Sequence, residues 1–187
     1  MKKGPIIILI LTAALVITSL IISNKNQKYL LDEKVSYVSE SLEEMIEFEE
    51  TLQETITLAE TTFKESIINL NNVSFSNASV DNETNQMIMK NKLSLIEDYV
   101  VLQSELEFLK ETHEALKTYI DEVKEAFEKY SDSYEDLDDN TDDPISNYNG
   151  LKEEYDLAFN GFDYRVDAFG KSVNLLVSLY QTLVSYK

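Results

Sequence analysis

The sequence predicts an all-α protein: an N-terminal transmembrane helix followed by an elongated antiparallel three-helix coiled-coil bundle. Three observations lead to this fold class. Residues 5–23 form an uncharged apolar run, and the rest of the chain repeats apolar residues at alternating steps of four and three. Polar stretches at 71–86 and 131–143 separate the repeating segments. Such heptad spacing is typical of helices that pack against each other, and differs from the alternation of strands.

The apolar run "PIIILILTAALVITSLIIS" at residues 5–23 is expected to be a membrane anchor. As a helix it spans ~28 Å, close to the thickness of bilayer hydrocarbon. It is longer than the h-region of a signal peptide, roughly 7–15 residues, and no A-x-A cleavage site follows it. These two points favour a retained signal-anchor over a cleaved signal peptide, and predict a single-pass protein bound to membrane lipid through residues 5–23.

The orientation of the anchor is expected to place most of the chain outside the cytoplasm. Lys2 and Lys3 precede the span, and Lys25, Lys28 and Lys34 follow it. The balance of basic residues on the two sides is nearly even. A minimal two-lysine head before a first apolar segment usually stays in the cytosol. Residues 1–4 are therefore predicted to be a cytoplasmic head, and residues 24–187 an extracytoplasmic bundle at the cell envelope.

The first bundle helix is expected at about residues 27–70, with no proline or glycine to interrupt it. Every position of its seam is apolar except Glu49 and Ser66. The seam consists of Leu31, Val35, Val38, Leu42, Met45, Glu49, Leu52, Ile56, Ala59, Phe63, Ser66 and Leu70. Further apolar residues beside this seam could support self-association: Ile46, Phe48, Ile67 and Ile68.

The second helix is expected at about residues 87–130, and only Lys92 and His113 interrupt its apolar seam. His113 is the one histidine of the chain. The seam consists of Ile88, Lys92, Leu95, Tyr99, Leu102, Leu106, Leu109, His113, Leu116, Ile120, Val123, Phe127 and Tyr130.

The third helix is expected at about residues 144–187, with Asp143 as its N-cap and Pro144 as its first residue. Two consecutive steps of four, from Ala158 to Val166, break the heptad and relax the supercoil locally. A turn at Asn160-Gly161 would be the alternative to one continuous helix. The seam consists of Tyr148, Leu151, Tyr155, Ala158, Phe162, Val166, Phe169, Val173, Leu176, Tyr180 and Leu183.

The strongly acidic charge of the chain limits which classes of partner it can bind. It carries 35 acidic and 16 basic residues, for a net charge of −19. Such a surface repels phosphates, so nucleic acid is not an expected partner. The absence of cysteine removes disulfides, thiolate catalysis and cysteine metal sites.

The acidic stretch "DLDDNTDDPISN" from residue 136 offers a weak divalent-cation candidate. It places oxygen side chains at calcium-loop positions 1, 3, 5 and 7. Its residues in these positions are Asp136, Asp138, Asn140 and Asp142. Thr141 stands where such a loop needs glycine, and Asn147 where it needs a bidentate glutamate. A solvated turn is therefore the favoured interpretation.

We expect a buried polar layer inside the bundle. It is formed by three charged or polar residues that depart from the apolar seam pattern: Glu49, His113 and Arg165. Similar lengths of helix separate each from the membrane-proximal end of the bundle (31–49, 113–130 and 148–165). Buried together, they can satisfy one another. Fixing helix register is the favoured role for this layer, and a pH- or ligand-responsive switch is the alternative.

The sequence predicts no enzyme and no cofactor. No glycine-rich phosphate loop, nucleophile motif or Glu-x-x-His pair is present. We expect a membrane-anchored interaction or spacer protein, binding an unidentified protein partner or forming a homo-oligomer. The alternative is a sensor or ligand-binding accessory module of a partner membrane protein.

Overall fold

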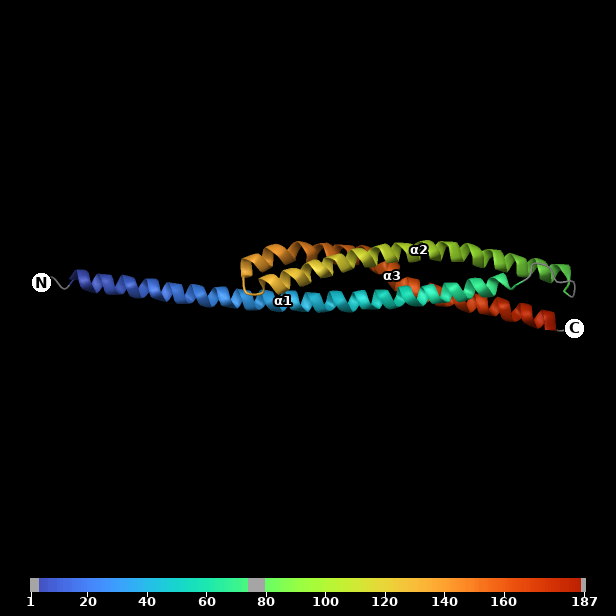
Figure 1. Ribbon diagram of the computed structural model, residues 1–187, viewed down its shortest axis with the longest axis horizontal. Coiled ribbons are helices and arrows are strands. Elements are labelled where there is room, and N and C mark those ends of the chain that lie inside the picture. The colour runs from blue at the N-terminus through green and yellow to red at the C-terminus, as the bar shows by residue number, and fades with distance from the viewer. Residues whose placement is uncertain (1–3, 74–79, 186–187) are drawn as a thin grey trace. The chain divides into compact units, whose positions relative to one another are not determined.

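The computed structural model describes residues 4–73 and 80–185, and describes side chains in the first helix from residue 19 onwards, residue 21 excepted. Within these ranges all regular elements are α-helices: α1 (Gly4–Asn71), α2 (Asn82–Tyr130) and α3 (Tyr134–Ser185). Figure 1 shows the three in chain order. The prediction of an all-α protein with three long helices is confirmed.

The expected anchor, residues 5–23, coincides with the start of α1. Most of its side chains, those of residues 5–18 and 21, lie outside the described residues. Among the described residues, no helix has the length and apolar character needed to cross a bilayer.

The chain divides into two compact units, and every helix contributes to both. Unit 1 comprises Met1–Ile46 and Tyr119–Tyr148, and unit 2 comprises Glu47–Thr118 and Asn149–Lys187. In unit 1, α1 runs parallel to α3, because Lys34 meets Asp138 and the Met45 carbonyl accepts a hydrogen bond from the Tyr148 hydroxyl at 3.0 Å.

In unit 2, α2 runs antiparallel to α1. Glu49 of α1 meets His113 of α2, and just beyond the end of α1 the Val73 carbonyl meets Lys92. Helix α3 runs parallel to α1, since Phe48 packs on Phe159 and Phe63 packs on Phe169. These pairings make unit 2 a three-helix bundle with one helix reversed.

The predicted seams supply most of the core. Leu52, Leu106, Leu116, Phe162 and Val173 are each at most 2 % exposed. Ala158 of the third seam is the exception, because it is exposed to solvent. It lies at the break in the heptad, where two steps of four shift the seam around the helix.

Helix α2 begins earlier than expected, at Asn82. Asp81 caps it: its carboxylate accepts hydrogen bonds from the Thr84 backbone N–H at 2.9 Å and from the Thr84 hydroxyl at 2.7 Å. These bonds satisfy a free amide of the first turn and lower the pKa of Asp81 below its usual value. The sequence pattern missed this start because the first turns of α2 carry few apolar residues.

Helix α3 also begins earlier, at Tyr134 rather than at Pro144. The Ser133 carbonyl accepts the first helical bond, from Leu137 N–H, so Ser133 is the N-cap in place of Asp143. Pro144 lies inside the helix and removes one backbone hydrogen bond. Leu137 and Thr141 are fully buried and continue the seam backwards from Tyr148. Their burial explains why the helix extends through the proline.

Candidate functional site

A buried polar contact joins α1 and α2 in unit 2. The His113 Nε2 atom lies 2.6 Å from the Glu49 Oε1 atom, with the two side chains 6 % and 19 % exposed. Glu114 lies further away, with its Oε1 atom 3.8 Å from His113 Nδ1. The structure thus brings together two of the three residues of the expected polar layer.

Arg165, the third residue of the expected layer, lies elsewhere. Its side chain is 47 % exposed, and its Nη2 atom is 2.9 Å from the Glu105 carboxylate of α2. The neighbouring Val166 takes the buried seam position and is 1 % exposed. The additional step of four before Val166 turns the arginine outward, so Arg165 forms an ion pair at the surface.

A hollow of about 390 Å³ lies beside this ion pair, between α2 and α3. Leu157 and Tyr164 border it and are 90 % and 74 % exposed. A Cβ atom added to Gly161 would meet no other atom within 4 Å, so this part of α3 is open. The lining residues are Glu105, Phe108, Leu109, Leu157, Ala158, Gly161, Phe162, Tyr164 and Arg165.

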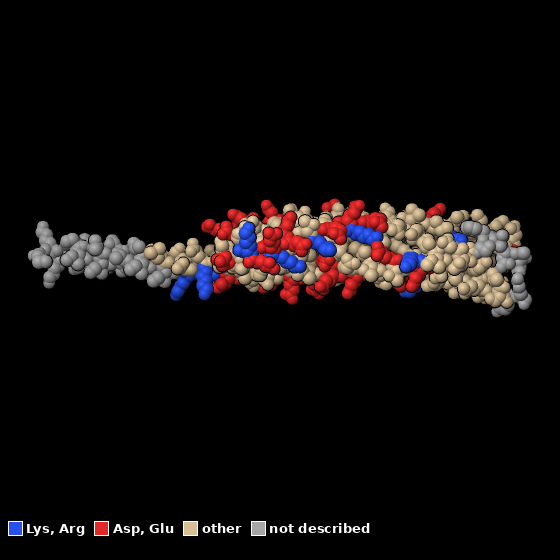
Figure 2. Space-filling view, in the orientation of Figure 1, with Lys and Arg blue, Asp and Glu red and all other residues tan. Residues whose placement is uncertain are grey.

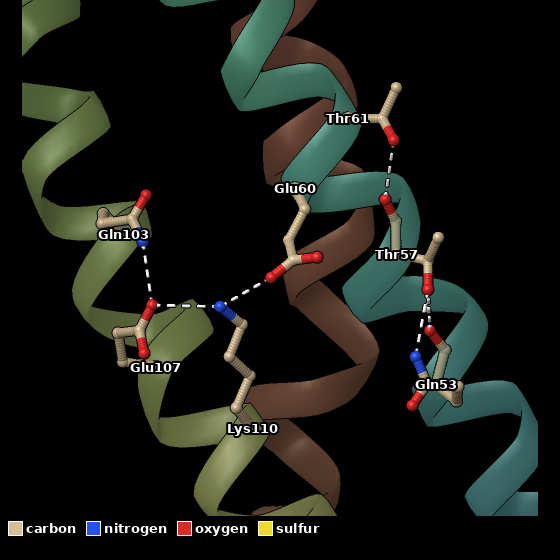
Figure 3. A network of polar contacts seen from close by, with 7 residues as sticks. All are labelled: Gln53, Thr57, Glu60, Thr61, Gln103, Glu107 and Lys110. Carbon is tan, nitrogen blue, oxygen red and sulfur yellow. Dashed lines mark hydrogen bonds and ion pairs between the residues drawn. The ribbon is translucent and has the colours of Figure 1, made fainter.

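Lys110 forms a second link between α1 and α2 in unit 2 (Figure 3). Its Nζ atom lies 2.7 Å from the Glu60 carboxylate and 3.2 Å from that of Glu107. The Gln103 amide donates to Glu107 at 3.0 Å. The hydrogen bond with Glu60, more than that with Glu107, raises the pKa of Lys110. The other contacts drawn in Figure 3 lie within α1, where Thr57 donates to the Gln53 carbonyl.

Among the described residues of unit 1, the most buried cation is Lys34, for which the sequence pattern predicts only a place beside the anchor. Its side chain is 8 % exposed and its Nζ atom is 2.6 Å from Asp138, with Asp142 as a second partner. Burial opposes the charge of Lys34, but the hydrogen bonds with Asp138 and Asp142 outweigh it and raise the pKa. These aspartates lie one turn apart on α3, so both reach one amine.

The stretch from residue 136, expected as a candidate cation loop, is part of helix α3, and its side chains contact other protein groups. Asp138 and Asp142 bind Lys34, while Asp136 accepts a hydrogen bond from the Ser133 hydroxyl at 2.7 Å. Asn140 donates to the Asp136 carbonyl at 2.7 Å. Among the described residues, no group of three or more histidine or carboxylate side chains is arranged to hold a metal ion. Helical geometry turns the four side chains around the axis, whereas a calcium loop converges them.

Lys92, the other seam exception of α2, is 5 % exposed, and its Nζ atom donates to the Val73 carbonyl at 2.7 Å. This amine lies just beyond the C-terminus of α1, where carbonyl groups lack helical partners. Burial lowers the pKa of Lys92. Its seam position in the sequence was the only signal of this role.

A stretch near one end of unit 2 lacks acidic residues in all three helices, in a chain that contains 35 of them, and the acids Asp81 and Glu83 lie beyond it around the start of α2. We define this acid-free end as residues 66–73 of α1 and its C-terminal turn, 84–96 of α2 and 168–185 of α3. Figure 2 shows mostly tan atoms over the corresponding part of the face in view. The exposed large apolar side chains of this end are Ile68, Met87, Met89, Leu93, Leu175 and Leu179.

The residues expected to support self-association from beside the first seam differ in exposure. Phe48 packs edge-on against Phe159, with ring centroids 5.2 Å apart, and Lys152 lies over its ring. Ile46 and Ile67 are half-buried. Only Ile68, 54 % exposed, offers a large free apolar surface.

Comparisons of the chain with protein-family models, with curated proteins and with solved structures returned no match. The function of the protein therefore has to be inferred from its own residues, contacts and charges.

Proposed function

We propose that this protein is a membrane-anchored helical-bundle interaction protein without catalytic activity, which binds other proteins or self-associates at the cell envelope. Residues 5–23 hold it to the membrane as a single-pass signal-anchor, and the helical bundle lies outside the cytoplasm. The uncharged length of residues 5–23 supports the anchor.

The observation that supports binding is the acid-free end of unit 2. Met89 and Leu93 are each 44 % exposed there, and Leu175 is 73 % exposed. Because the other parts of the helices carry many carboxylates, an apolar surface without carboxylates is unusual for this chain. Exposed apolar residues gathered in one place are characteristic of protein contact surfaces.

Site-specific photocrosslinking in native membranes tests this function. A benzoylphenylalanine in place of Leu175 is expected to capture a protein. The matched control carries the same probe in place of Leu58, which is 59 % exposed but stands between Glu54 and Glu60. Capture at neither position, or at both equally, would contradict a contact surface at the acid-free end.

A second candidate function, a ligand-binding accessory module of a partner membrane protein, is supported by the hollow of about 390 Å³. It combines the guanidinium of Arg165 with the apolar side chains of Phe108 and Leu157. A guanidinium beside apolar walls suits an amphipathic anion, which would replace Glu105 as the partner of Arg165. Fluorescence titration with anilinonaphthalene sulfonate tests it: binding should weaken in Arg165→Gln, and unchanged binding would discard this candidate.

A further inference from the structure

We propose that the acid-free end of unit 2 is a self-association surface, on which the α2/α3 face of one copy packs against the same face of a second copy. This inference rests on the proposed interaction function and names its partner. The contact is centred on Leu175 and Leu179 of α3 and on the adjoining part of α2.

The charge distribution selects a second copy as the occupant. Two chains of net charge −19 repel each other wherever their carboxylates approach. On α2 no acid lies between Glu83 and Glu97, and on α3 none follows Asp167. Within the helical bundle, the acid-free end is therefore a part of the chain where two copies can meet away from most carboxylates. A strongly basic partner would instead be drawn to the acidic remainder.

The shape of the same face is self-complementary. A hollow of about 260 Å³ lies between α2 and α3, walled by the small residues Ser94 and Ser172 and floored by Leu95 and Leu176. Leu175 borders it and projects from α3 with 73 % of its surface exposed. The hollow is larger than the ~150 Å³ cavity that admits a benzene molecule.

A two-fold symmetric contact needs a projection and a hollow on one patch, because each copy must present both. Leu175 supplies the projection and the α2/α3 hollow receives it. A second hollow, about 450 Å³, runs along α2 beside Met89 and Leu93 and shares Ser94 with the first. The two hollows thus adjoin at Ser94, and the charged side chains of Lys90 and Glu97 line the second one beside Met89 and Leu93.

The test uses the full chain in membranes, expressed as two copies with different affinity tags. With benzoylphenylalanine in place of Leu175, irradiation is expected to give a band at twice the 21.5 kDa chain mass that carries both tags. The probe in place of Leu58 should give no such band. Leu175→Glu should weaken recovery of the second tag by about 10-fold, since it exposes a carboxylate to its own symmetry mate.

Leu58→Glu, at a position of α1 that is 59 % exposed and outside the acid-free end, is the matched control for that substitution and should leave recovery unchanged. Because Leu175 is exposed, Leu175→Glu should retain the helical circular dichroism of the parent, and Leu175→Ser provides a second, uncharged variant with the same expected direction. Capture of a different protein at Leu175, without a doubly tagged band, would overturn the second-copy inference but retain the interaction function. No capture of any protein at Leu175 would overturn both.

Discussion

At the scale of single residues, the Glu49–His113 contact replaces two apolar seam positions with a polar pair. We predict that His113→Leu and Glu49→Leu each lower the free energy of unfolding by about 1–3 kcal/mol, because each leaves one polar group without its partner. The double variant should recover most of this loss, since the seam is then apolar throughout. Urea denaturation of the four proteins measures the coupling.

A double variant that loses the sum of the two single effects would show that the residues act independently. A role in helix register is separate from this contribution to stability. An all-leucine seam tolerates slipped helix pairings, whereas a buried polar pair opposes them. Lys110→Met provides a matched comparison: it breaks a contact between the same two helices at a more exposed position. Its effect should stay below about 1 kcal/mol.

Lys34 is predicted to stabilise unit 1 up to alkaline pH. Lys34→Met should lower the free energy of unfolding by about 1–2 kcal/mol near neutral pH, because it leaves Asp138 and Asp142 unpaired one turn apart. The pKa of Lys34 is raised in the folded chain above the ordinary 10.5. Its contribution is therefore fully present below that value and disappears as the pH rises through the folded pKa.

Denaturant unfolding of the parent and Lys34→Met across neutral and alkaline pH measures this contribution. The difference between the two should shrink above about pH 10.5. Adding Asp138→Asn and Asp142→Asn to Lys34→Met should restore stability near neutral pH, because no uncompensated charge remains. A difference that stays constant with pH would assign the effect to packing of the lysine stem instead.

At the scale of helices, the start of α3 gives the clearest test. If α3 begins at Tyr134, Leu137 is a core residue, and Leu137→Ala should cost about 2–4 kcal/mol of unfolding free energy. If residues 131–143 formed a loop, the same change would cost little. Asp139→Ala, on the exposed side of the same turn, is the control and should change stability by less than about 0.5 kcal/mol.

The interior of the helices and their C-terminal ends were predictable from sequence, but the starts of α2 and α3 were not. Heptad periodicity located the buried seams because packing of long helices depends on spacing alone. The start of α3 was missed because Pro144 and the surrounding aspartates resemble a break. Leu137 and Thr141 stand at seam spacing before Tyr148, and this was the available signal.

The polar contacts were predictable only in part, for a geometric reason. Glu49 and His113 lie at similar helical distances from one end of the bundle, and no break in either seam lies within those distances. Residue spacing therefore predicts that they pair, as the structure shows. The same count fails for Arg165 because the additional residue in the α3 seam rotates it outward. Lys34 binds Asp138 and Asp142, residues over a hundred positions away, and no spacing rule indicates such a partner.

At the scale of the whole molecule, the chain separates three kinds of surface along its sequence. The uncharged residues 5–23 come first, most carboxylates follow, and the acid-free end of unit 2 contains the last residues of α3. The proposed anchor supports the proposed self-association, because an anchor would confine all copies to one membrane. Confinement raises the effective concentration of each copy for another, so even a small apolar contact can associate.

The proposed anchor and its orientation are testable because the chain contains no cysteine. The full chain should sediment with membranes and require detergent for release, whereas residues 25–187 alone should remain in the aqueous fraction. In intact cells, a membrane-impermeant maleimide should label Glu128→Cys, which lies at an exposed position of α2. Lys3→Cys, in the expected cytoplasmic head, should be labelled only after the membrane is permeabilised.

Each part of this result tests a different physical claim. Release of the full chain by salt or alkali alone would contradict a spanning segment, because an apolar run of this length is held by its burial in hydrocarbon. Labelling of Lys3→Cys but not Glu128→Cys in intact cells would keep the anchor and reverse its orientation. That outcome is physically accessible, since lysines flank the run on both sides, and it would move the acid-free end into the cytoplasm.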